Sequence, residues 1–232
     1  MVPERFDSIR DIPLFADISE ESFETLTRGA FVQNFPPNVE IISEGEAADF
    51  LHIVQSGCVE LLSHWNGRES TITTLHENST FILAATIKDR PNLMSAKTLL
   101  KSRIIMLPSE NVRSVFATDH SFAFAIVDEL SRCYRATIKN MKNLKLRTSI
   151  ERLANYLLKQ HKRQNNAIRF TLPIEKRRLA SYLGMTPENL SRAFGNLKPC
   201  GVEVDGQNIT LTNLDELIAF AKPDELIDWS SG

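Results

Sequence analysis

Residues 174–213 constrain the fold more than any other part of the chain, because their pattern predicts two short helices joined by a tight turn. Gly184 gives the turn a position that adopts a left-handed backbone at no steric cost. Thr186 and Pro187 are residue types preferred at a helix N-terminus, where a hydroxyl caps a backbone N–H and proline loses no hydrogen bond. Apolar residues at helical spacing give each helix one face to bury: Leu179, Ala180 and Leu183 in the first, and Leu190, Phe194 and Leu197 in the second.

A β-hairpin is predicted directly after the second helix. Residues 202–212 alternate apolar and polar side chains around Asp205-Gly206, a dipeptide typical of a type I′ turn. Two helices followed by such a hairpin form a winged helix–turn–helix, which is a DNA-binding unit. The alternative is an ordinary helical hairpin inside a globular protein.

The second helix presents polar side chains on the face opposite its apolar stripe. A recognition helix meets base edges near its N-terminus, where the Glu188 carboxylate would accept from cytosine N4 and the Arg192 guanidinium would bind guanine O6 and N7. We therefore predict DNA contacts from Thr186, Glu188, Asn189, Ser191 and Arg192 of the second helix, and from Lys176 and Arg177 of the first.

The charge of the chain is unevenly distributed, although the net charge is only −2. Residues 147–201 hold 11 Lys and Arg against 3 Asp and Glu. A local basic surplus is the expected footprint of contacts with DNA phosphates, and a solvated basic face is the alternative. The basic residues are Arg147, Arg152, Lys159, Lys162, Arg163, Arg169, Lys176, Arg177, Arg178, Arg192 and Lys198.

The first half of the chain predicts a short helix followed by β-structure. Ser19 has the position of a helix N-cap, and the acidic residues after it suit the helix dipole. The segments that follow are short, rich in β-branched residues and separated by turn signals such as Asn66-Gly67. Such spacing predicts a sandwich or jelly roll. The expected strands are 39–43, 50–55, 58–63, 70–75 and one or two within 95–107.

A long helix is predicted between the two halves, from His120 to about Lys145. Its apolar residues recur at alternating spacings of 3 and 4, as along the seam of a coiled coil. We expect this seam to join two copies of the chain. The alternative is a core helix with a broader apolar stripe, which Ile126, Cys133 and Ile138 would supply. The seam residues are Val127, Leu130, Tyr134, Thr137, Met141 and Leu144.

The motif PENLSRAFGNL, which contains Glu188, Ser191 and Arg192, resembles the recognition helix of the cyclic-AMP receptor and fumarate-nitrate reduction regulator (Crp/Fnr) superfamily of bacterial transcription factors. The resemblance covers nearly the whole chain and implies an α+β fold. Its parts would be a cyclic-nucleotide-binding-like β jelly roll over 1–118, a dimerisation helix over 119–146 and a winged helix–turn–helix over 147–232. The segment 79–96 is similar to the corresponding segment of Dnr-type and FtrB-like members.

The resemblance also implies a function. Members of this superfamily are homodimers that read palindromes of TTGA-type half-sites in double-stranded DNA, so Glu188 and Arg192 would contact the central G·C pair and Ser191 a neighbouring thymine or phosphate. We expect a transcription activator that is controlled by an effector bound in the jelly roll and that contacts RNA polymerase. Two alternatives are a ligand-binding regulatory module whose C-terminal domain contacts protein, and a regulator that binds a cyclic nucleotide.

The predicted effector pocket departs from the pattern of nucleotide-binding members. These carry a Gly-Glu pair and a later Arg-Ser or Arg-Thr pair that binds the cyclic phosphate, whereas this chain has Ser79-Thr80-Phe81 near the first position and Asn92-Leu93 near the second. A buried phosphate without an arginine is poorly compensated, so we expect an apolar or haem-type effector instead of a cyclic nucleotide. The expected pocket residues are Phe81, Ile82, Leu83, Asn92 and Met94.

Metal and cluster sites are not predicted. Cys58, Cys133 and Cys200 are too far apart for an iron–sulfur cluster or a zinc site. His52 in an expected strand has the pattern of a core residue, and His64 and His76 have the pattern of loop residues, with haem ligation as the alternative for each.

Other classes of protein are disfavoured. No apolar run approaches the roughly 18 residues that a membrane span needs, so we expect no membrane partner and a cytoplasmic location, which the scattered cysteines also suit. No catalytic triad, metal-ligand spacing or Gly-rich phosphate loop is evident, so we expect no enzyme.

Overall fold

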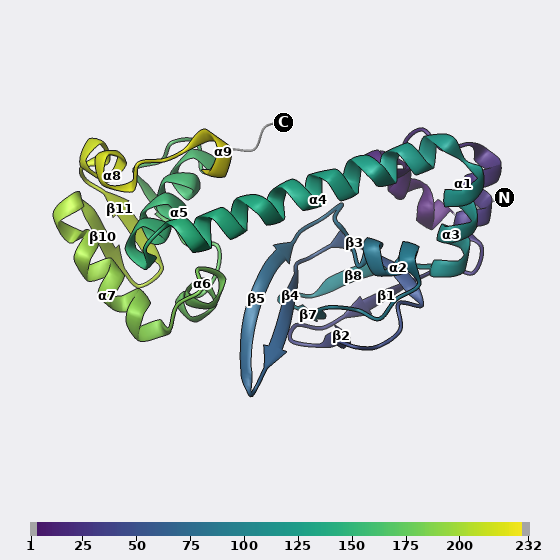
Figure 1. Ribbon diagram of the computed structural model, residues 1–232, viewed down its shortest axis with the longest axis horizontal. Helices are drawn as coiled ribbons and strands as arrows, with labels where there is room; N and C mark the ends of the chain where they lie inside the picture. The colour runs from purple at the N-terminus through teal and green to yellow at the C-terminus, as the bar shows by residue number, and fades with distance from the viewer. Residues whose placement is uncertain (1–3, 229–232) are drawn as a thin grey trace. The chain divides into compact units, whose positions relative to one another are not determined.

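The computed structural model describes residues 4–228. The chain forms two compact units, Met1–Cys133 and Tyr134–Gly232 (Figure 1). Both units contain helices and sheets, so the predicted α+β class is confirmed. The boundary between the units falls inside one long helix, α4 (His120–Leu146), which is continuous over 27 residues.

Two four-stranded antiparallel sheets form the centre of the N-terminal unit, with strand orders β1-β8-β3-β6 and β2-β7-β4-β5. Apolar side chains of both sheets meet in one core, which includes Val54, Leu61, Phe81 and Ile104. The predicted sandwich is therefore confirmed. The strands are β1 (Phe31–Phe35), β2 (Glu40–Ile42), β3 (Phe50–Ser56), β4 (Val59–Trp65), β5 (Arg68–Leu75), β6 (Thr80–Phe81), β7 (Ser95–Thr98) and β8 (Ser102–Pro108).

Two of these strands were not predicted. β1 lies at the edge of its sheet, where it pairs with β8 from Phe31↔Met106 to Phe35↔Ser102, and most of its side chains are exposed or half-buried. β6 is two residues long and pairs with His52 and Ile53 of β3. Neither strand has the alternation of a half-buried strand over enough residues to be recognised from sequence.

Helices form a second core in the N-terminal unit, in which Phe15, Phe23, Val112 and Phe122 are fully or almost fully buried. Ser19 caps α1 as predicted, since its hydroxyl accepts from the Ser22 backbone N–H at 3.2 Å. The helices are the 3₁₀ helices η1 (Glu4–Asp11) and η2 (Pro13–Phe15), then α1 (Glu20–Thr27), α2 (Leu83–Lys88), α3 (Ser109–Thr118) and the first part of α4.

The C-terminal unit is a winged helix–turn–helix. Its helices and a three-stranded sheet with the order β10-β11-β9 share one apolar core. The elements after α4 are α5 (Ser149–Arg163), β9 (Arg169–Thr171), α6 (Lys176–Tyr182), α7 (Pro187–Leu197), η3 (Lys198–Cys200), β10 (Val202–Asp205), β11 (Asn208–Leu211), α8 (Leu214–Ala221) and α9 (Glu225–Asp228).

The turn of the wing differs from the predicted type. Asp205 pairs with Asn208, so the two-residue loop is Gly206-Gln207 rather than Asp205-Gly206. Gly206 has φ +57°, and Gln207 is not among the described residues with positive φ. A positive φ at the first central position alone is the pattern of a type II′ turn, which also suits a hairpin. The hairpin prediction is confirmed and the type I′ turn is wrong.

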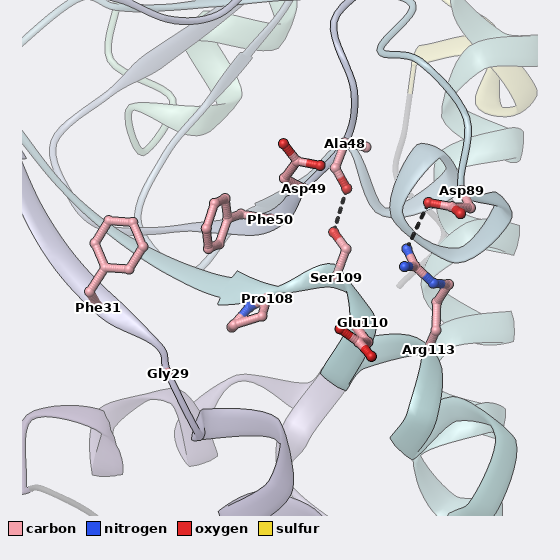
Figure 2. A pocket seen from close by; sticks show the side chains of 10 residues that line it. All are labelled: Gly29, Phe31, Ala48, Asp49, Phe50, Asp89, Pro108, Ser109, Glu110 and Arg113. Atoms are coloured by element: carbon pink, nitrogen blue, oxygen red, sulfur yellow. Dashed lines mark hydrogen bonds and ion pairs between the residues drawn. The ribbon is translucent and has the colours of Figure 1, made fainter.

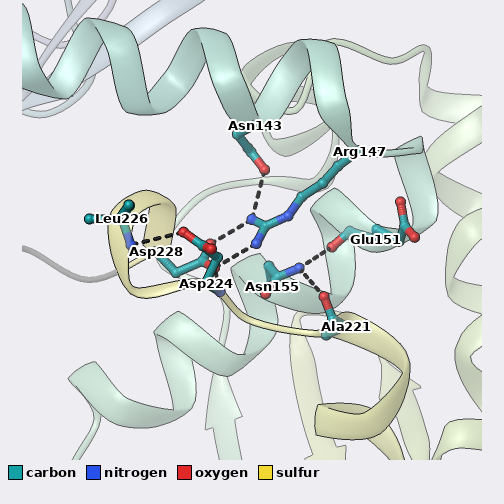
Figure 3. A network of polar contacts seen from close by, with 8 residues as sticks. All are labelled: Asn143, Arg147, Glu151, Asn155, Ala221, Asp224, Leu226 and Asp228. Atoms are coloured by element: carbon teal, nitrogen blue, oxygen red, sulfur yellow. Dashed lines mark hydrogen bonds and ion pairs between the residues drawn. The ribbon is translucent and has the colours of Figure 1, made fainter.

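A buried polar network joins the end of α4 to α5 and to the C-terminal segment (Figure 3). Arg147 donates two hydrogen bonds of 2.6 Å to the Asp228 carboxylate and a third to Asn143. Asn155, two turns along α5, donates to the carbonyls of Glu151 and Ala221. Arg147 is therefore part of the interior of its unit.

Candidate nucleic-acid interface and sensor interior

The predicted helix–turn–helix is confirmed in detail. Leu179 and Ala180 on α6, Leu183 at its C-cap, and Leu190 and Leu197 on α7 are at most 2% exposed. Gly184 has φ +65° in the turn, as the sequence predicted. The Thr186 hydroxyl caps α7 by accepting from the Asn189 backbone N–H at 3.2 Å. One face of α7 is thereby fixed against the core and the opposite face is left to solvent.

Four predicted DNA-contacting residues lie on that exposed face: Glu188, Asn189, Ser191 and Arg192. The Arg192 guanidinium donates to the Asn189 side-chain oxygen. The pKa of the Glu188 carboxyl is held below its usual range by its own backbone N–H, by the Thr186 hydroxyl and by the Arg192 charge. A carboxylate and a guanidinium are thus presented side by side, one helical turn apart.

Two further predicted residues come from α6. Arg177 is exposed and Lys176 is half-buried, with its ammonium 5.4 Å from the centre of the Phe194 ring on α7. The seven predicted residues therefore come from α6, α7 and the turn that joins them.

Two arginines of the basic segment, which was predicted to contact DNA phosphates, bind groups within their own unit. Arg147 forms the buried ion pair described above, and the Arg152 guanidinium donates to the carbonyls of Leu183 at 2.8 Å and Arg147 at 2.8 Å. Burial lowers the pKa of Arg152. The assignment of Arg147 to phosphate contacts is wrong, because its side chain is buried in an ion pair. A phosphate contact from the half-buried Arg152 stays a prediction. Sequence reasoning missed that Arg152 holds the turn between α6 and α7.

The predicted seam of α4 is largely exposed in a single chain. Val127, Tyr134, Met141 and Leu144 have 56%, 67%, 42% and 41% of their surface exposed, and Thr137 is exposed too. Leu130 differs, since it is half-buried against the helical core of the N-terminal unit. Phe124, which is 75% exposed, was missed, although an aromatic residue three positions before Val127 was a usable signal.

The predicted effector-pocket residues are not gathered in one place. Phe81, Ile82 and Met94 contribute to the core between the two sheets, whereas Leu83 packs in the helical core. The separation has a local cause, because Ile82 has φ +60° and α2 begins at Leu83, so the chain changes direction between them. Asn92 is buried, with its side-chain nitrogen 3.5 Å from the Ala47 carbonyl oxygen.

His52 is a core residue, as its strand pattern suggested. It is 7% exposed, its Nδ1 lies 3.0 Å from the Phe50 carbonyl oxygen, and its ring centre is 5.1 Å from that of Phe81. Burial lowers its pKa to about 4, and the hydrogen bond to Phe50 opposes this only in part.

A cavity of about 400 Å³ lies elsewhere in the N-terminal unit (Figure 2). The Phe31 and Phe50 rings meet edge to face beside it, and Arg113 pairs with Asp89 at 3.1 Å on its other side. The Ser109 hydroxyl closes one wall by donating to the Ala48 carbonyl at 2.6 Å. None of the predicted effector residues lines this cavity.

The described residues contain neither a cluster of metal-ligand side chains nor a membrane-spanning helix. No group of three or more His, Cys, Asp or Glu within residues 4–228 is arranged to hold a metal ion. In the same part of the chain, no helix is both long and apolar enough to cross a membrane.

Comparison with known proteins matches both units. Residues 32–119 match the cyclic nucleotide-binding domain, and residues 151–220 match the Crp-like helix-turn-helix domain. The CRP-like cAMP-activated global transcriptional regulator of Mycobacterium tuberculosis is 23% identical over 215 residues, which cover 90% of this chain and 96% of that protein. The transcriptional activator protein FnrA of Stutzerimonas stutzeri is 23% identical over 186 residues, or 78% and 76% of the two chains.

A solved structure shares the fold. FixK2 from Bradyrhizobium japonicum superposes with a TM-score of 0.68 at 22% identity, over 88% of this chain and 99% of that one. The two domain matches occur in the order β-roll and then helix–turn–helix, with α4 between them, as in the architecture described above. The chain belongs to the Crp/Fnr superfamily of transcription regulators.

Proposed function

We propose that this regulator acts in the cytoplasm as a homodimer that reads a palindrome of TTGA-type half-sites and activates transcription through contact with RNA polymerase. The observation that carries the proposal is the exposed face of α7, which presents Glu188 and Arg192 together at a capped helix N-terminus. A regulatory role, rather than catalysis, fits the helix–turn–helix and the β-roll described above.

Each residue of the reading helix has a role that follows from its chemistry. Arg192 has the fork geometry that binds guanine O6 and N7, and Glu188 accepts from the cytosine amino group of the same or the adjacent pair. Its lowered pKa keeps Glu188 ionised at neutral pH, as an acceptor must be. Thr186, Asn189 and Ser191 supply short polar groups, and Lys176 and Arg177 contribute charge toward the phosphates.

We further propose that the α4 seam joins the two subunits. Val127, Tyr134, Met141 and Leu144 are too exposed in one chain to be core residues, and burying such a stripe against a second copy would remove it from water. A two-fold arrangement would then place two α7 helices on half-sites about one DNA turn apart, roughly 34 Å.

The effector of the β-roll is proposed to be apolar or of haem type. Support comes from the core between the sheets, to which apolar residues such as Val54, Leu61 and Phe81 contribute. The buried His52, whose ring lies beside Phe81, is a polar neighbour of this core. The Mycobacterium tuberculosis relative is named as cAMP-activated, so a cyclic nucleotide is the competing ligand. Lys97 lies on β7 next to Ala96, and since neighbouring residues of a strand face opposite sides, Lys97 points away from the core that holds Ala96.

The reading mode is tested by comparing Arg192→Ala with Arg177→Ala on a duplex that carries a TTGA-type palindrome and on a random duplex. Arg192→Ala should lose on the order of 1–3 kcal/mol at the half-site guanine, because it removes a base contact. Arg177→Ala should weaken binding to both duplexes alike, because phosphates carry no sequence.

The outcome separates the proposal from its rival. Equal losses on the two duplexes for Arg192→Ala would remove the base-contact role. A wild-type protein that shifts neither duplex would favour the alternative in which the C-terminal unit contacts protein.

A further inference from the structure

Nothing within the described part of the chain explains why residue 195 of α7 is a glycine. Glycine lowers helix stability relative to alanine because it loses more backbone freedom on folding. Gly195 is not among the glycines with positive φ, so its backbone does not require glycine. Its own helix and chain neighbours apart, no described atom lies within 4 Å of a Cβ built at this position. Neither conformation nor packing accounts for the missing side chain.

The position of Gly195 on the helix points outward. It lies seven residues after Glu188 and three and four residues after Arg192 and Ser191, on the exposed face of α7. The buried residues Leu190, Ala193 and Leu197 define the opposite face. Gly195 therefore continues the row that we propose to face DNA, one turn beyond Arg192.

Beside Gly195 lies a groove of about 290 Å³ between α7 and the wing. Of the described residues that line it, two are lysines, Lys176 and Lys198, and none is acidic. The floor is apolar and is formed by Pro187, Leu190, Phe194 and Val204. Lys176 keeps its ammonium close to the Phe194 ring, 5.4 Å from the ring centre, and the exposed Ser191 adds a hydroxyl. The groove thus has two lysine ammonium groups, the Ser191 hydroxyl as a hydrogen-bond donor, and the bare backbone of Gly195 along one side.

We propose that this groove seats a DNA phosphate, which approaches the backbone of α7 at Gly195 and is flanked by Lys176, Lys198 and Ser191. The inference rests on the proposed DNA binding and adds to it an anchoring point and two residues, Gly195 and Lys198. A phosphate complements the two lysines of the groove, and glycine is the residue used where backbone approaches a ligand closely. The contact positions α7 on the duplex and carries no sequence information.

The test is Gly195→Ala in the full-length protein, measured for thermal stability and for DNA affinity. The added methyl group meets nothing in the chain and favours the helix, so the melting temperature should rise by about 2–4 °C. The same methyl group would displace the phosphate, so affinity should fall by about tenfold or more on palindromic and random duplexes alike. Stability and binding therefore change in opposite directions.

Two further variants separate loss of the phosphate contact from a change in helix stability. Asn196→Ala also favours the helix but does not line the groove, and it should leave affinity within about twofold. Lys198→Gln should reduce the dependence of log affinity on log salt by about 0.9 for each subunit bound, because one phosphate contact is lost.

Each outcome decides a separate point. If the wild-type protein binds neither duplex, the proposed function is wrong and this inference falls with it. If the wild type binds and Gly195→Ala binds equally well, only the phosphate seat is wrong. Equal weakening by Gly195→Ala and Asn196→Ala would also overturn it, because the cause would then be helix stiffness.

Discussion

At the scale of single residues, burial decides which polar groups act inside the protein and which are available to partners. His52 and Arg192 illustrate the two cases. His52 is buried on β3, where it pairs with Phe81 of β6, and its neutral ring hydrogen-bonds the Phe50 carbonyl. Arg192 is exposed, and its hydrogen bond to the exposed Asn189 is one that a DNA base can replace. We therefore expect His52 to affect stability, and we propose Arg192 for recognition.

Protonation of His52 should destabilise the N-terminal unit at acid pH. Its pKa is about 4 in the folded chain, against an ordinary histidine pKa of 6.5, so the unfolded chain binds the proton first as the pH falls. The stability it contributes is complete above about pH 6.5 and is lost as the pH falls toward 4. Over that window the loss should be on the order of 3 kcal/mol.

Urea unfolding of the wild type and of His52→Gln at pH 7 and pH 4.5 would measure this effect. The variant should start less stable and lose less on acidification, because glutamine does not titrate. Carboxyl groups such as Asp119, whose pKa is lowered to about 2 by hydrogen bonds from Ser22 and Phe122, remain ionised at pH 4.5 in both proteins. An equal loss in wild type and variant would show that His52 is not the titrating group.

At the scale of elements, the junction of α4 and α5 is held by buried polar contacts. The Arg147–Asp228 pair attaches α9 to the end of α4, and Arg152 connects α5 to the turn between α6 and α7. Thr148 and Glu151 form a capping box at the start of α5, which sets the direction of the chain between the helices. The C-terminal segment thereby supports the reading helix indirectly.

Removal of the Asp228 carboxylate should therefore destabilise the C-terminal unit. Asp228→Ala leaves the Arg147 guanidinium buried without its ion-pair partner, which typically costs about 3–5 kcal/mol. Glu225→Ala in the same helix is the control, since an exposed change should cost less than about 0.5 kcal/mol. Chemical denaturation followed by circular dichroism would measure both, and Arg147→Met combined with Asp228→Ala should recover much of the loss. A cost for Asp228→Ala no larger than that of the control would remove the pair from the junction.

The helix caps and turns also show which structural features could be predicted from the sequence. Thr186, Gly184 and Ser19 act on backbone groups within a few residues, so the caps and the turn of α7 and α1 were predictable. The partners of Arg147 and Arg152 were not predictable, because they lie 81 and 31 positions away in the sequence. The type of the wing turn depended on the register of β10 and β11, which places Gly206 first in the loop.

At the scale of the whole molecule, the open question is how two copies of this chain would meet. Tyr134, Met141 and Leu144 are exposed on α4 at heptad spacing, and Phe124 extends the apolar row toward the start of the helix. Leu130 already packs in the helical core of its own unit. A substitution at Leu130 would therefore change the stability of its own unit as well as the dimer. Met141 is the better position for testing the dimer, because it is exposed in a single chain.

Met141→Glu should convert the proposed dimer to a monomer. In a dimer joined along the seam the new carboxylate would be buried without a partner, whereas in the monomer it is solvated. Sedimentation velocity should show the shift to lower mass, and binding to a palindrome should fall toward that of a single half-site. Ala136→Glu, exposed on the same helix but outside the seam, is the control and should stay dimeric. A Met141→Glu protein that keeps the mass of the wild-type dimer would place the interface elsewhere, and the spacing of the two α7 helices would then have to be explained by that surface.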